Sequence, residues 1–284
     1  MQNDLLARIK NQYDRFSKGQ KLLADYILNN YDKAVFLTAA KLGDIVGVSE
    51  STVVRFAAAL GFEGYPALNK ALEAMVKNRL NSAQRMEVNF DRLNQGNILK
   101  SVLHADAEKI RRTMEEIDEE AFNRAVEIIL NAGDIYIMGV RSSAPLAGFL
   151  YFYIKIIFRQ VKLIQSNSGS ELFEQLYHIG AEDVIIGISF PRYSSSTLKA
   201  VEFARDRKAH IITVTDSYNS PLTAFTNCNL IAGSDLANVV DSLVAPMSVI
   251  NALVVALYLK KQDKVVDTYA SLEEIWREYK VYKD

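Results

Sequence analysis

The segment Thr38–Leu60 reads TAAKLGDIVGVSESTVVRFAAAL, two stretches with helical spacing joined by a glycine turn. Gly43 is small enough for two helices to approach closely, and Gly47, four residues later, can adopt the positive φ of a tight turn. Apolar residues on both sides of the turn repeat at helical spacing and are expected to face inward: Leu42, Val46, Val48, Val53 and Phe56. The segment therefore predicts a helix-turn-helix unit.

The second helix of this unit carries a polar face suited to DNA. Ser49 stands at the expected N-cap, where its hydroxyl can accept a hydrogen bond from a first-turn N–H. In helix-turn-helix proteins the start of the second helix enters the major groove, where hydroxyl and guanidinium groups reach phosphates and base edges. We expect contacts to double-stranded DNA from Ser49, Glu50, Ser51, Thr52 and Arg55, although Glu50 repels phosphate and could instead support the helix start. A plain helical hairpin is the alternative.

The segment lies in an all-helical N-terminal region. Helical spacing of apolar residues extends from residue 5 to about residue 80. Residues 1–85 hold 12 basic and 8 acidic residues, whereas the whole chain of 284 residues holds 33 and 34. A mildly basic region in a nearly neutral protein favours a nucleic-acid partner. We expect residues 1–80 to form a DNA-binding domain and the polar residues 81–97, which lack a clear period, to form a linker.

The remainder of the chain has a different pattern, with five short apolar runs rich in β-branched residues. Runs that are apolar on both faces and alternate with helices are typical of a parallel sheet covered by helices on both sides. The predicted strands are DIYIMG (134–139), VKLIQ (161–165), DVIIGIS (183–189), HIITVTD (210–216) and NLIAG (229–233), and the predicted helices include Ile98–Ile117, Glu119–Asn131, Val239–Lys261 and Leu272–Tyr279. The predicted fold class is α + α/β, a helical domain followed by a five-stranded parallel-sheet α/β sandwich over residues 98–284.

Several kinds of site and location are disfavoured. A single cysteine, Cys228, excludes an internal disulfide framework, and its apolar neighbours indicate a small buried side chain. The three histidines share no metal-ligand spacing, so we expect no metal and no cofactor. The first residues lack the apolar core of a signal peptide, and the apolar stretches Ala144–Phe158 and Leu243–Leu259 are shorter than a ~20-residue membrane span. We therefore expect buried helices, no membrane partner and a cytoplasmic protein.

Two of the predicted strands end in loops with the chemistry of an anion site. Ligands of open α/β sheets lie beyond the carboxyl ends of strands, near helix N-termini whose free N–H groups attract anions. The first loop, MGVRSSAPLAG (138–148), contains Arg141 and two serines that could cap the next helix, and Pro145 suits the first turn of that helix. The second, ISFPRYSSST (188–197), contains Arg192 and several hydroxyl groups. Two arginines at adjoining strand ends would favour a phosphate or carboxylate ligand, and surface arginines beside capped helices are the alternative.

Three consecutive patterns make the N-terminal region recognisable: ADYIL (24–28), GVSESTVVRF (47–56) and LGFEGYPAL (60–68). Together they resemble the N-terminal domain of RpiR-type bacterial transcription regulators, with Leu42-Gly43 in place of that family's usual Leu-Ala pair. The resemblance implies that the second half is a sugar-isomerase-type (SIS) domain that binds phosphosugars. It also implies a homodimer or homotetramer that binds a palindromic operator and regulates genes of carbohydrate catabolism.

The resemblance also bears on the two loops. SIS domains usually have Gly-x-Gly-x-Ser at the first loop and Ser-x-Ser-Gly-x-Thr at the second. Here Arg141 replaces the second glycine, and Ser189 is followed by Phe190-Pro191-Arg192-Tyr193-Ser194. With the loop chemistry, the resemblance predicts that an anionic sugar effector contacts Gly139, Arg141, Ser142, Ser143, Ser189, Arg192 and Ser194, and that no residue is catalytic.

Two other functions stay open at this point. A sugar-phosphate isomerase would need a general base, and neither loop contains Glu or His; the nearest carboxylate in a strand-end segment is Glu171. Alternatively, the second domain binds no ligand and only holds a dimer together. Asp216, Ser217 and Ser168 also follow predicted strands and are weaker candidates for ligand contact.

Overall fold

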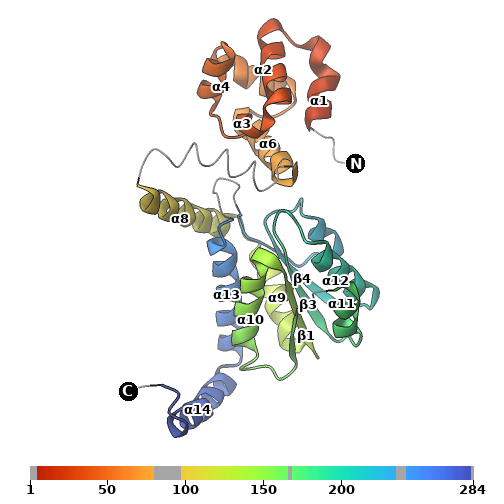
Figure 1. The fold of residues 1–284 in the computed structure, drawn as a ribbon, viewed down its shortest axis with the longest axis vertical. Coiled ribbons are helices and arrows are strands. Elements are labelled where there is room, and N and C mark those ends of the chain that lie inside the picture. Colours follow the sequence, from red (N-terminus) through yellow and green to blue (C-terminus); the bar gives the residue numbers. More distant parts are fainter. Residues whose placement is uncertain (1–4, 80–96, 166–167, 235–240, 283–284) are drawn as a thin grey trace. The chain divides into compact units, whose positions relative to one another are not determined.

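A computed structural model describes residues 5–79, 97–165, 168–234 and 241–282, and the chain divides into two compact units (Figure 1). The described part of the first unit ends at Arg79, and the second unit begins at Asn97. Apart from Asn97, the linker predicted over residues 81–97 lies outside the described residues. The predicted class, a helical region followed by a five-stranded parallel sheet with helices, is confirmed.

The first unit is built from short helices around one core. Its α-helices in the described residues are α1 (Leu5–Gln12), α2 (Lys18–Asn29), α3 (Tyr31–Ala34), α4 (Ala39–Val46), α5 (Glu50–Ala59) and α6 (Tyr65–Arg79). Their apolar faces meet in a buried cluster that includes Ile9, Leu23, Ile27 and Leu68. The rings of Phe16 and Phe56 lie 5.1 Å apart in this cluster.

Helices α4 and α5 join as the sequence predicts. Gly47 ends α4 with a φ of 76°, and the Val48 N–H donates a hydrogen bond of 2.9 Å to the Gly43 carbonyl. A Cβ at Gly43 would lie 2.7 Å from the Val48 carbonyl oxygen, which explains the need for a very small residue there. Of the predicted inward residues, Leu42, Val53 and Phe56 are fully buried, and Val46 and Val48 are partly buried at the edge of the core.

The second unit contains a parallel sheet with strand order β2-β1-β3-β4-β5. The strands lie within the predicted runs: β1 (Ile135–Gly139), β2 (Val161–Ile164), β3 (Val184–Ile188), β4 (His210–Thr215) and β5 (Asn229–Ile231). The helices are α8 (Ile98–Glu116), α9 (Glu119–Asn131), α10 (Ala144–Ile154), α11 (Gly169–Leu176), α12 (Ser195–Asp206), α13 (Val244–Lys260) and α14 (Gln262–Glu278).

Helices cover both faces of the sheet, as predicted (Figure 1). Alternate residues of each strand face opposite layers, so that Ile135 and Ile137 pack against α9, α10 and α13, whereas Tyr136 and Met138 pack against α11 and α12. From β1 the chain continues to β2 on one side and then crosses to β3 on the other side of β1. The loops that follow β1 and β3 therefore lie side by side.

The end of the chain differs from the prediction. Residues 241–243 are not helical, and α13 begins at Val244 rather than Val239, which lies outside the described residues. The last helix is also longer than predicted, because it begins at Gln262 instead of Leu272. The first three residues of this helix, Gln262, Asp263 and Lys264, are polar and interrupt the apolar spacing. Residues of these types are nevertheless compatible with a helix. Among the described residues no single helix is long and apolar enough to cross a membrane; only α13 and α14 taken together, bent by 96°, reach that length and composition.

Candidate functional site

The first turns of α5 present a polar surface to solvent. Ser49 is the N-cap, as predicted, and its Oγ accepts a hydrogen bond of 3.3 Å from the Thr52 N–H. Glu50, Ser51 and Arg55 are exposed, whereas Val53 on the opposite side of the helix is fully buried. The Glu50 carboxylate lies in the first turn, where it favours the helix start because that end of a helix carries partial positive charge.

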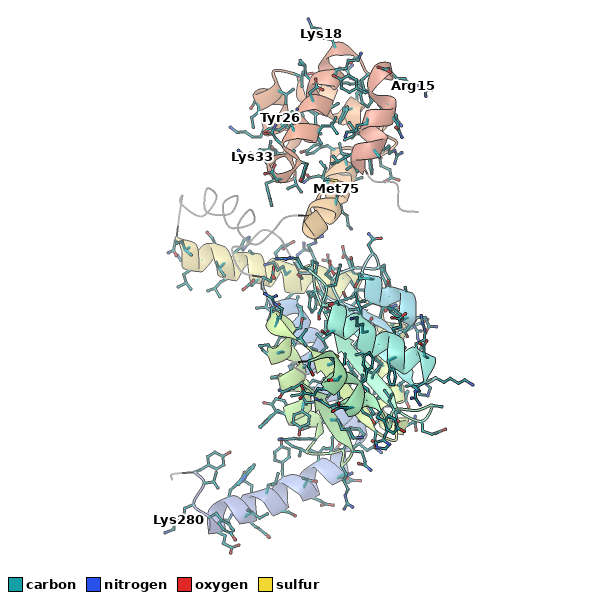
Figure 2. All side chains as sticks on the ribbon, turned by 45° about the vertical axis from the view of Figure 1, so that its right-hand side comes forward. Arg15, Lys18, Tyr26, Lys33, Met75 and Lys280 are labelled. Atoms are coloured by element: carbon teal, nitrogen blue, oxygen red, sulfur yellow. The ribbon has the colours of Figure 1, made fainter. Side chains whose placement is uncertain are left out.

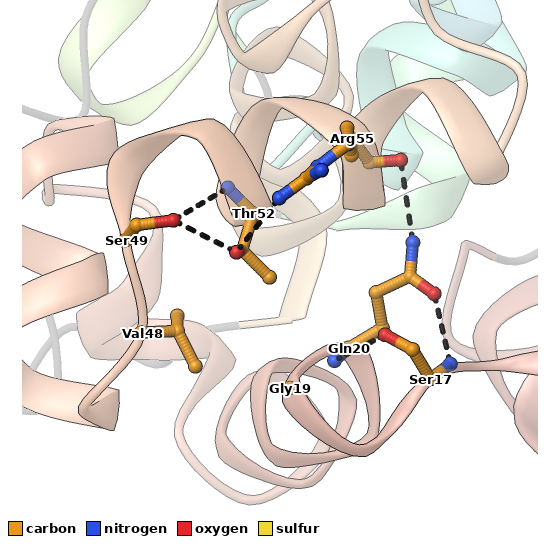
Figure 3. A pocket seen from close by; sticks show the side chains of 7 residues that line it. All are labelled: Ser17, Gly19, Gln20, Val48, Ser49, Thr52 and Arg55. Atoms are coloured by element: carbon orange, nitrogen blue, oxygen red, sulfur yellow. Dashed lines mark hydrogen bonds between the residues drawn. The ribbon is translucent and has the colours of Figure 1, made fainter.

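Thr52 is only half-buried and faces the start of α2. A hollow of about 460 Å³ lies there, lined by Ser17, Gly19, Gln20, Val48, Ser49, Thr52 and Arg55 (Figure 3). A Cβ at Gly19 would come within 3.3 Å of the Thr52 methyl group, so α2 and α5 approach closely. Ser17 and Gln20 form a reciprocal capping box at the start of α2. The hollow is therefore walled by the first turns of two helices.

Arg55 is held along the surface of α5. Its Nε donates to the Ser51 carbonyl at 3.2 Å. Its Nη2 lies 3.4 Å from the Thr52 hydroxyl, a contact drawn in Figure 3. The Gln20 amide donates in turn to the Arg55 carbonyl at 3.5 Å. A guanidinium has five N–H donors, so these contacts leave donors for a further acceptor. Two more exposed cations, Arg15 and Lys18, flank the start of α2 and project from the same unit (Figure 2).

In the second unit, the predicted effector residues gather at the carboxyl edge of the sheet. Gly139, the last residue of β1, pairs with Ile188, the last residue of β3, so the loops carrying Arg141 and Arg192 begin at adjoining positions. Both arginines are exposed. A Cβ at Gly139 would lie 2.7 Å from the Ser143 carbonyl oxygen, so glycine lets the first loop fold back over the strand end.

The first loop differs from the predicted capped turn. Residues Arg141–Ser143 form a single 3-10 turn before α10, and neither Ser142 nor Ser143 caps that helix through its side chain. Ser143 is buried and has helical φ and ψ, a backbone conformation in which an N-cap hydroxyl does not reach the first-turn N–H groups. Pro145 lies in the first turn of the helix, as predicted, and the helix begins at Ala144. Arg141 has a φ of 55°, the left-handed conformation that a glycine adopts more readily.

Three hydrogen bonds help to hold the second loop in place. The Ser194 N–H donates to the Ser189 Oγ at 3.1 Å, and the Ser194 Oγ caps α12 by accepting from the Thr197 N–H at 3.4 Å. The Tyr193 hydroxyl donates to the buried Asp216 carboxylate at 2.8 Å. Burial and then the Asp216 charge raise the pKa of Tyr193, so this hydroxyl remains a donor. Arg192 thus projects from a loop whose neighbouring residues are held in place.

Two residues of this edge, Tyr193 and Thr197, were not among the predicted contacts, and Asp216 was only a weaker candidate. Tyr193 and Asp216 form the pair just described, and a pairing between two loops leaves no local sequence signal. Thr197 lies in the first turn of α12, is fully buried, and finds no hydrogen-bond partner for its Oγ1 among the described residues. The usual second loop of SIS domains ends in a threonine, so counting back from the helix rather than forward from Ser189 would have identified it.

Ser168 and Glu171 also lie at this edge of the sheet, because β2 is parallel to β1 and pairs with it. Ser168 caps α11 by accepting a hydrogen bond from the Glu171 N–H, and Glu171 is half-buried in the first turn after the edge strand β2. Cys228 is buried as predicted, and burial raises the pKa of its thiol to about 11. All three histidines are exposed, and the described residues contain no cluster of His, Cys, Asp or Glu that could hold a metal ion.

Comparison with known proteins agrees with this two-part organisation. Residues 3–79 match the family described as "Helix-turn-helix domain, rpiR family", and residues 128–256 match the SIS domain family. The regulator HexR of Escherichia coli K12 is 24% identical over 286 residues, which cover 97% of this chain and 95% of that protein. An uncharacterized HTH-type transcriptional regulator of Clostridium perfringens is 24% identical over 228 residues, 80% of each chain.

Solved structures show the same fold. NanR of Vibrio vulnificus in complex with ManNAc-6P has a TM-score of 0.59 at 21% identity and covers 97% of this chain and 99% of its own. The sugar isomerase domain of an RpiR transcription factor from Sphaerobacter thermophilus has a TM-score of 0.60 at 23% identity and covers 63% and 99%. With both domain families matched in this order and relatives named as regulators along nearly its whole length, the chain belongs to the RpiR family of helix-turn-helix transcriptional regulators with a C-terminal SIS domain.

Proposed function

We propose that this regulator binds operator DNA through α5 and that an anionic sugar metabolite, such as a phosphosugar, controls it from the carboxyl edge of the sheet. Residues 1–80 form the DNA-binding domain in this proposal, residues 81–97 the linker, and residues 98–284 the effector-binding and dimerisation domain. The regulated genes are those of carbohydrate catabolism, since a sugar-derived effector reports on that metabolism.

The observation that carries the DNA-binding part is the open polar face at the start of α5. Ser51 and Arg55 are exposed there, while the apolar side of the helix is buried in the core. Hydroxyl groups can donate to phosphate oxygens, and a guanidinium can bind guanine or phosphate with two parallel hydrogen bonds. Arg15 and Lys18 add positive charge to the same unit, and positive charge strengthens binding to the DNA backbone.

The support for the effector part is the adjoining pair of loops with Arg141 and Arg192. Arginine is suited to phosphate and carboxylate because its planar group donates two parallel hydrogen bonds. Ser189 and Ser194 accept bonds from the backbone, yet each hydroxyl keeps a hydrogen that it can donate to an anion. NanR, which shares this fold, binds ManNAc-6P, a sugar phosphate. Control requires that the effector bind one arrangement of the DNA-binding domains better than another.

The DNA-binding proposal is tested by a gel shift with the full chain and a duplex selected from a random library by the wild-type protein. Arg55→Ala should weaken binding about 5- to 150-fold, because a base contact by arginine contributes about 1–3 kcal/mol. Lys33→Ala is the matched control, since Lys33 is an exposed cation on α3 of the same unit. Equal affinity of wild-type and Arg55→Ala protein at 150 mM salt would exclude Arg55 from the interface.

The effector proposal is tested by thermal shift with a panel of sugar phosphates and their unphosphorylated sugars. A ligand that binds the folded state at 100 times its Kd stabilises it by about 2.7 kcal/mol, so a true effector raises the melting temperature clearly. Arg192→Ala should abolish this shift, while Arg159→Ala, an exposed arginine just before β2 at the opposite edge, should preserve it. If no member of the panel stabilises the protein, a domain that only dimerises becomes the better account.

A further inference from the structure

Helix α8 carries an apolar stripe that no described residue covers. Its inner side is held by polar contacts to the rest of the second unit: Thr113 accepts from the Gly233 N–H at 3.0 Å, and the Ser242 hydroxyl donates to Asp106 at 2.7 Å. Lys109, on the same inner side, is 4% exposed. The stripe lies beside this face and consists of Leu99 (68% exposed), Leu103 (59%), Ala107, Ile110 (41%) and Met114 (70%).

These five residues follow helical spacing, because each is three or four positions from the next. Such a continuous exposed row along most of a 19-residue helix is characteristic of an interface rather than of scattered surface side chains. The order of side chains along the row is symmetric. Two long side chains, Leu99 and Leu103, precede the small Ala107, and two others, Ile110 and Met114, follow it.

This symmetry identifies the partner. If a second α8 runs antiparallel against the first, Leu99 meets Met114 of the other copy, Leu103 meets Ile110, and the two Ala107 residues meet at the two-fold axis. In a two-fold interface the same patch serves both subunits and must complement itself, and a row that reads alike in both directions does so. The small central residue allows close approach of the two helices. We propose that α8 pairs antiparallel with α8 of a second copy of this chain.

The charges of α8 support the same arrangement. Lys100 lies in the first turn, while the last turn contains Glu115 and Glu116 and no basic residue. Both ends therefore oppose the helix dipole, which favours acidic residues at the start and basic residues at the end. An antiparallel partner compensates, because it places its acidic last turn beside Lys100, in addition to the ion pair that Glu115 forms with Arg111 of its own helix. A parallel partner would bring like charges together and align the two dipoles unfavourably.

The pairing also predicts how far apart the two DNA-binding units are attached. This consequence rests on the proposed DNA-binding function, whereas the pairing itself does not. At 1.5 Å per residue, the first residues of two antiparallel 19-residue helices lie roughly 27 Å apart along the axis. The DNA-binding units precede α8 in the sequence, so they would be attached at opposite ends of the pair. Half-sites one turn of DNA apart are about 34–36 Å from centre to centre, a distance of the same order.

Disulfide trapping tests the pairing without DNA or effector, so its result is independent of the proposed function. In an antiparallel pair only a residue near the two-fold axis meets its own twin. Ala107→Cys should therefore form an intermolecular disulfide under mild oxidation, visible as a dimer band on a non-reducing gel. Leu99→Cys should not, because eight residues from the axis its twin lies roughly 24 Å away. The wild-type chain is the background control, since its single cysteine is buried.

A second substitution shows whether the stripe itself holds the pair. Adding Leu103→Glu to Ala107→Cys should lower the disulfide yield several-fold, whereas adding Ser101→Glu, on the exposed polar side of α8, should leave it unchanged. Absence of a dimer band with Ala107→Cys in a folded protein overturns the proposal. Equal trapping of Leu99→Cys and Ala107→Cys would indicate a parallel pair and overturn it as well.

Discussion

Replacing Tyr193 by phenylalanine removes the hydroxyl that ties the second loop to the end of β4. The ring volume is kept, so the change leaves no cavity and removes the hydroxyl with its hydrogen bond of 2.8 Å to Asp216 and its weaker contacts to Ser217 and Ser220. Its acceptor, Asp216, is 8% exposed, and the Thr215 hydroxyl at 3.4 Å is a weaker donor to the same oxygen. Hydrogen bonds to charged groups contribute about 1.5–3 kcal/mol, and we expect the free energy of unfolding to fall by an amount in this range.

Urea denaturation followed by tryptophan fluorescence measures the free energy of unfolding of the second unit, which contains Tyr193. The only tryptophan of the chain, Trp276, lies on α14 and reports on the second unit. Tyr218→Phe is the matched control, because Tyr218 is 61% exposed and should change the midpoint little. A double-mutant cycle with Asp216→Asn isolates the pair. If Tyr193→Phe changes the free energy by less than ~0.5 kcal/mol, or by the same amount with Asn at position 216, this hydrogen bond does not anchor the loop.

Three further predictions concern backbone strain and pH. Gly47→Ala should destabilise the first unit by about 1–2 kcal/mol, seen as an earlier loss of helical circular dichroism, because φ is 76° but no atom lies within 4 Å of the added Cβ. Arg141→Gly should be about 1–2 kcal/mol more stable to urea than Arg141→Ala, because only glycine relieves a φ of 55°. The raised pKa of Tyr193 means that the folded protein holds this proton more tightly than the unfolded chain, so the stability difference between wild-type and Tyr193→Phe protein should be constant below pH 10 and shrink above it.

The fold was predictable where the sequence pattern is local and repeated. The five strands lie within the predicted apolar runs because parallel strands buried on both faces read as continuous apolar segments. The turn between α4 and α5 was predictable because Gly43 and Gly47 each meet a specific steric need. The start of α14 was not, since Gln262–Lys264 carry no apolar signal, and three polar residues alone do not distinguish a loop from the exposed start of a helix.

The candidate site was predictable only in part, because loops place residues through contacts between distant segments. Because ligands of open α/β sheets lie beyond the carboxyl ends of strands, we predicted that Arg141 and Arg192 lie in adjoining loops. The pairing of β1 with β3 confirms that these loops adjoin. The hydrogen bond from Tyr193 to Asp216 joins residues 23 positions apart and has no pattern in the sequence. The capping role expected of Ser142 and Ser143 failed because the chain forms a 3-10 turn directly continuous with α10, which leaves no extended residue to act as an N-cap.

The conformation of Arg141 bears on why this chain departs from the usual first loop. The residue keeps the left-handed backbone that the second glycine of Gly-x-Gly-x-Ser would supply, at a cost of about 1–2 kcal/mol for a residue with a Cβ. Strain of this size persists at sites where the side chain has a task that glycine cannot perform. The second loop shows a similar change, because Arg192 occupies the position of the glycine in the usual Ser-x-Ser-Gly-x-Thr sequence. Both loops thus exchange small or hydroxyl-bearing residues for positive charge, which favours an effector with more than one anionic group. A bis-anionic sugar acid phosphate should then stabilise the protein more than a neutral sugar carrying one phosphate, and the reverse order would show that the arginines do not share one ligand.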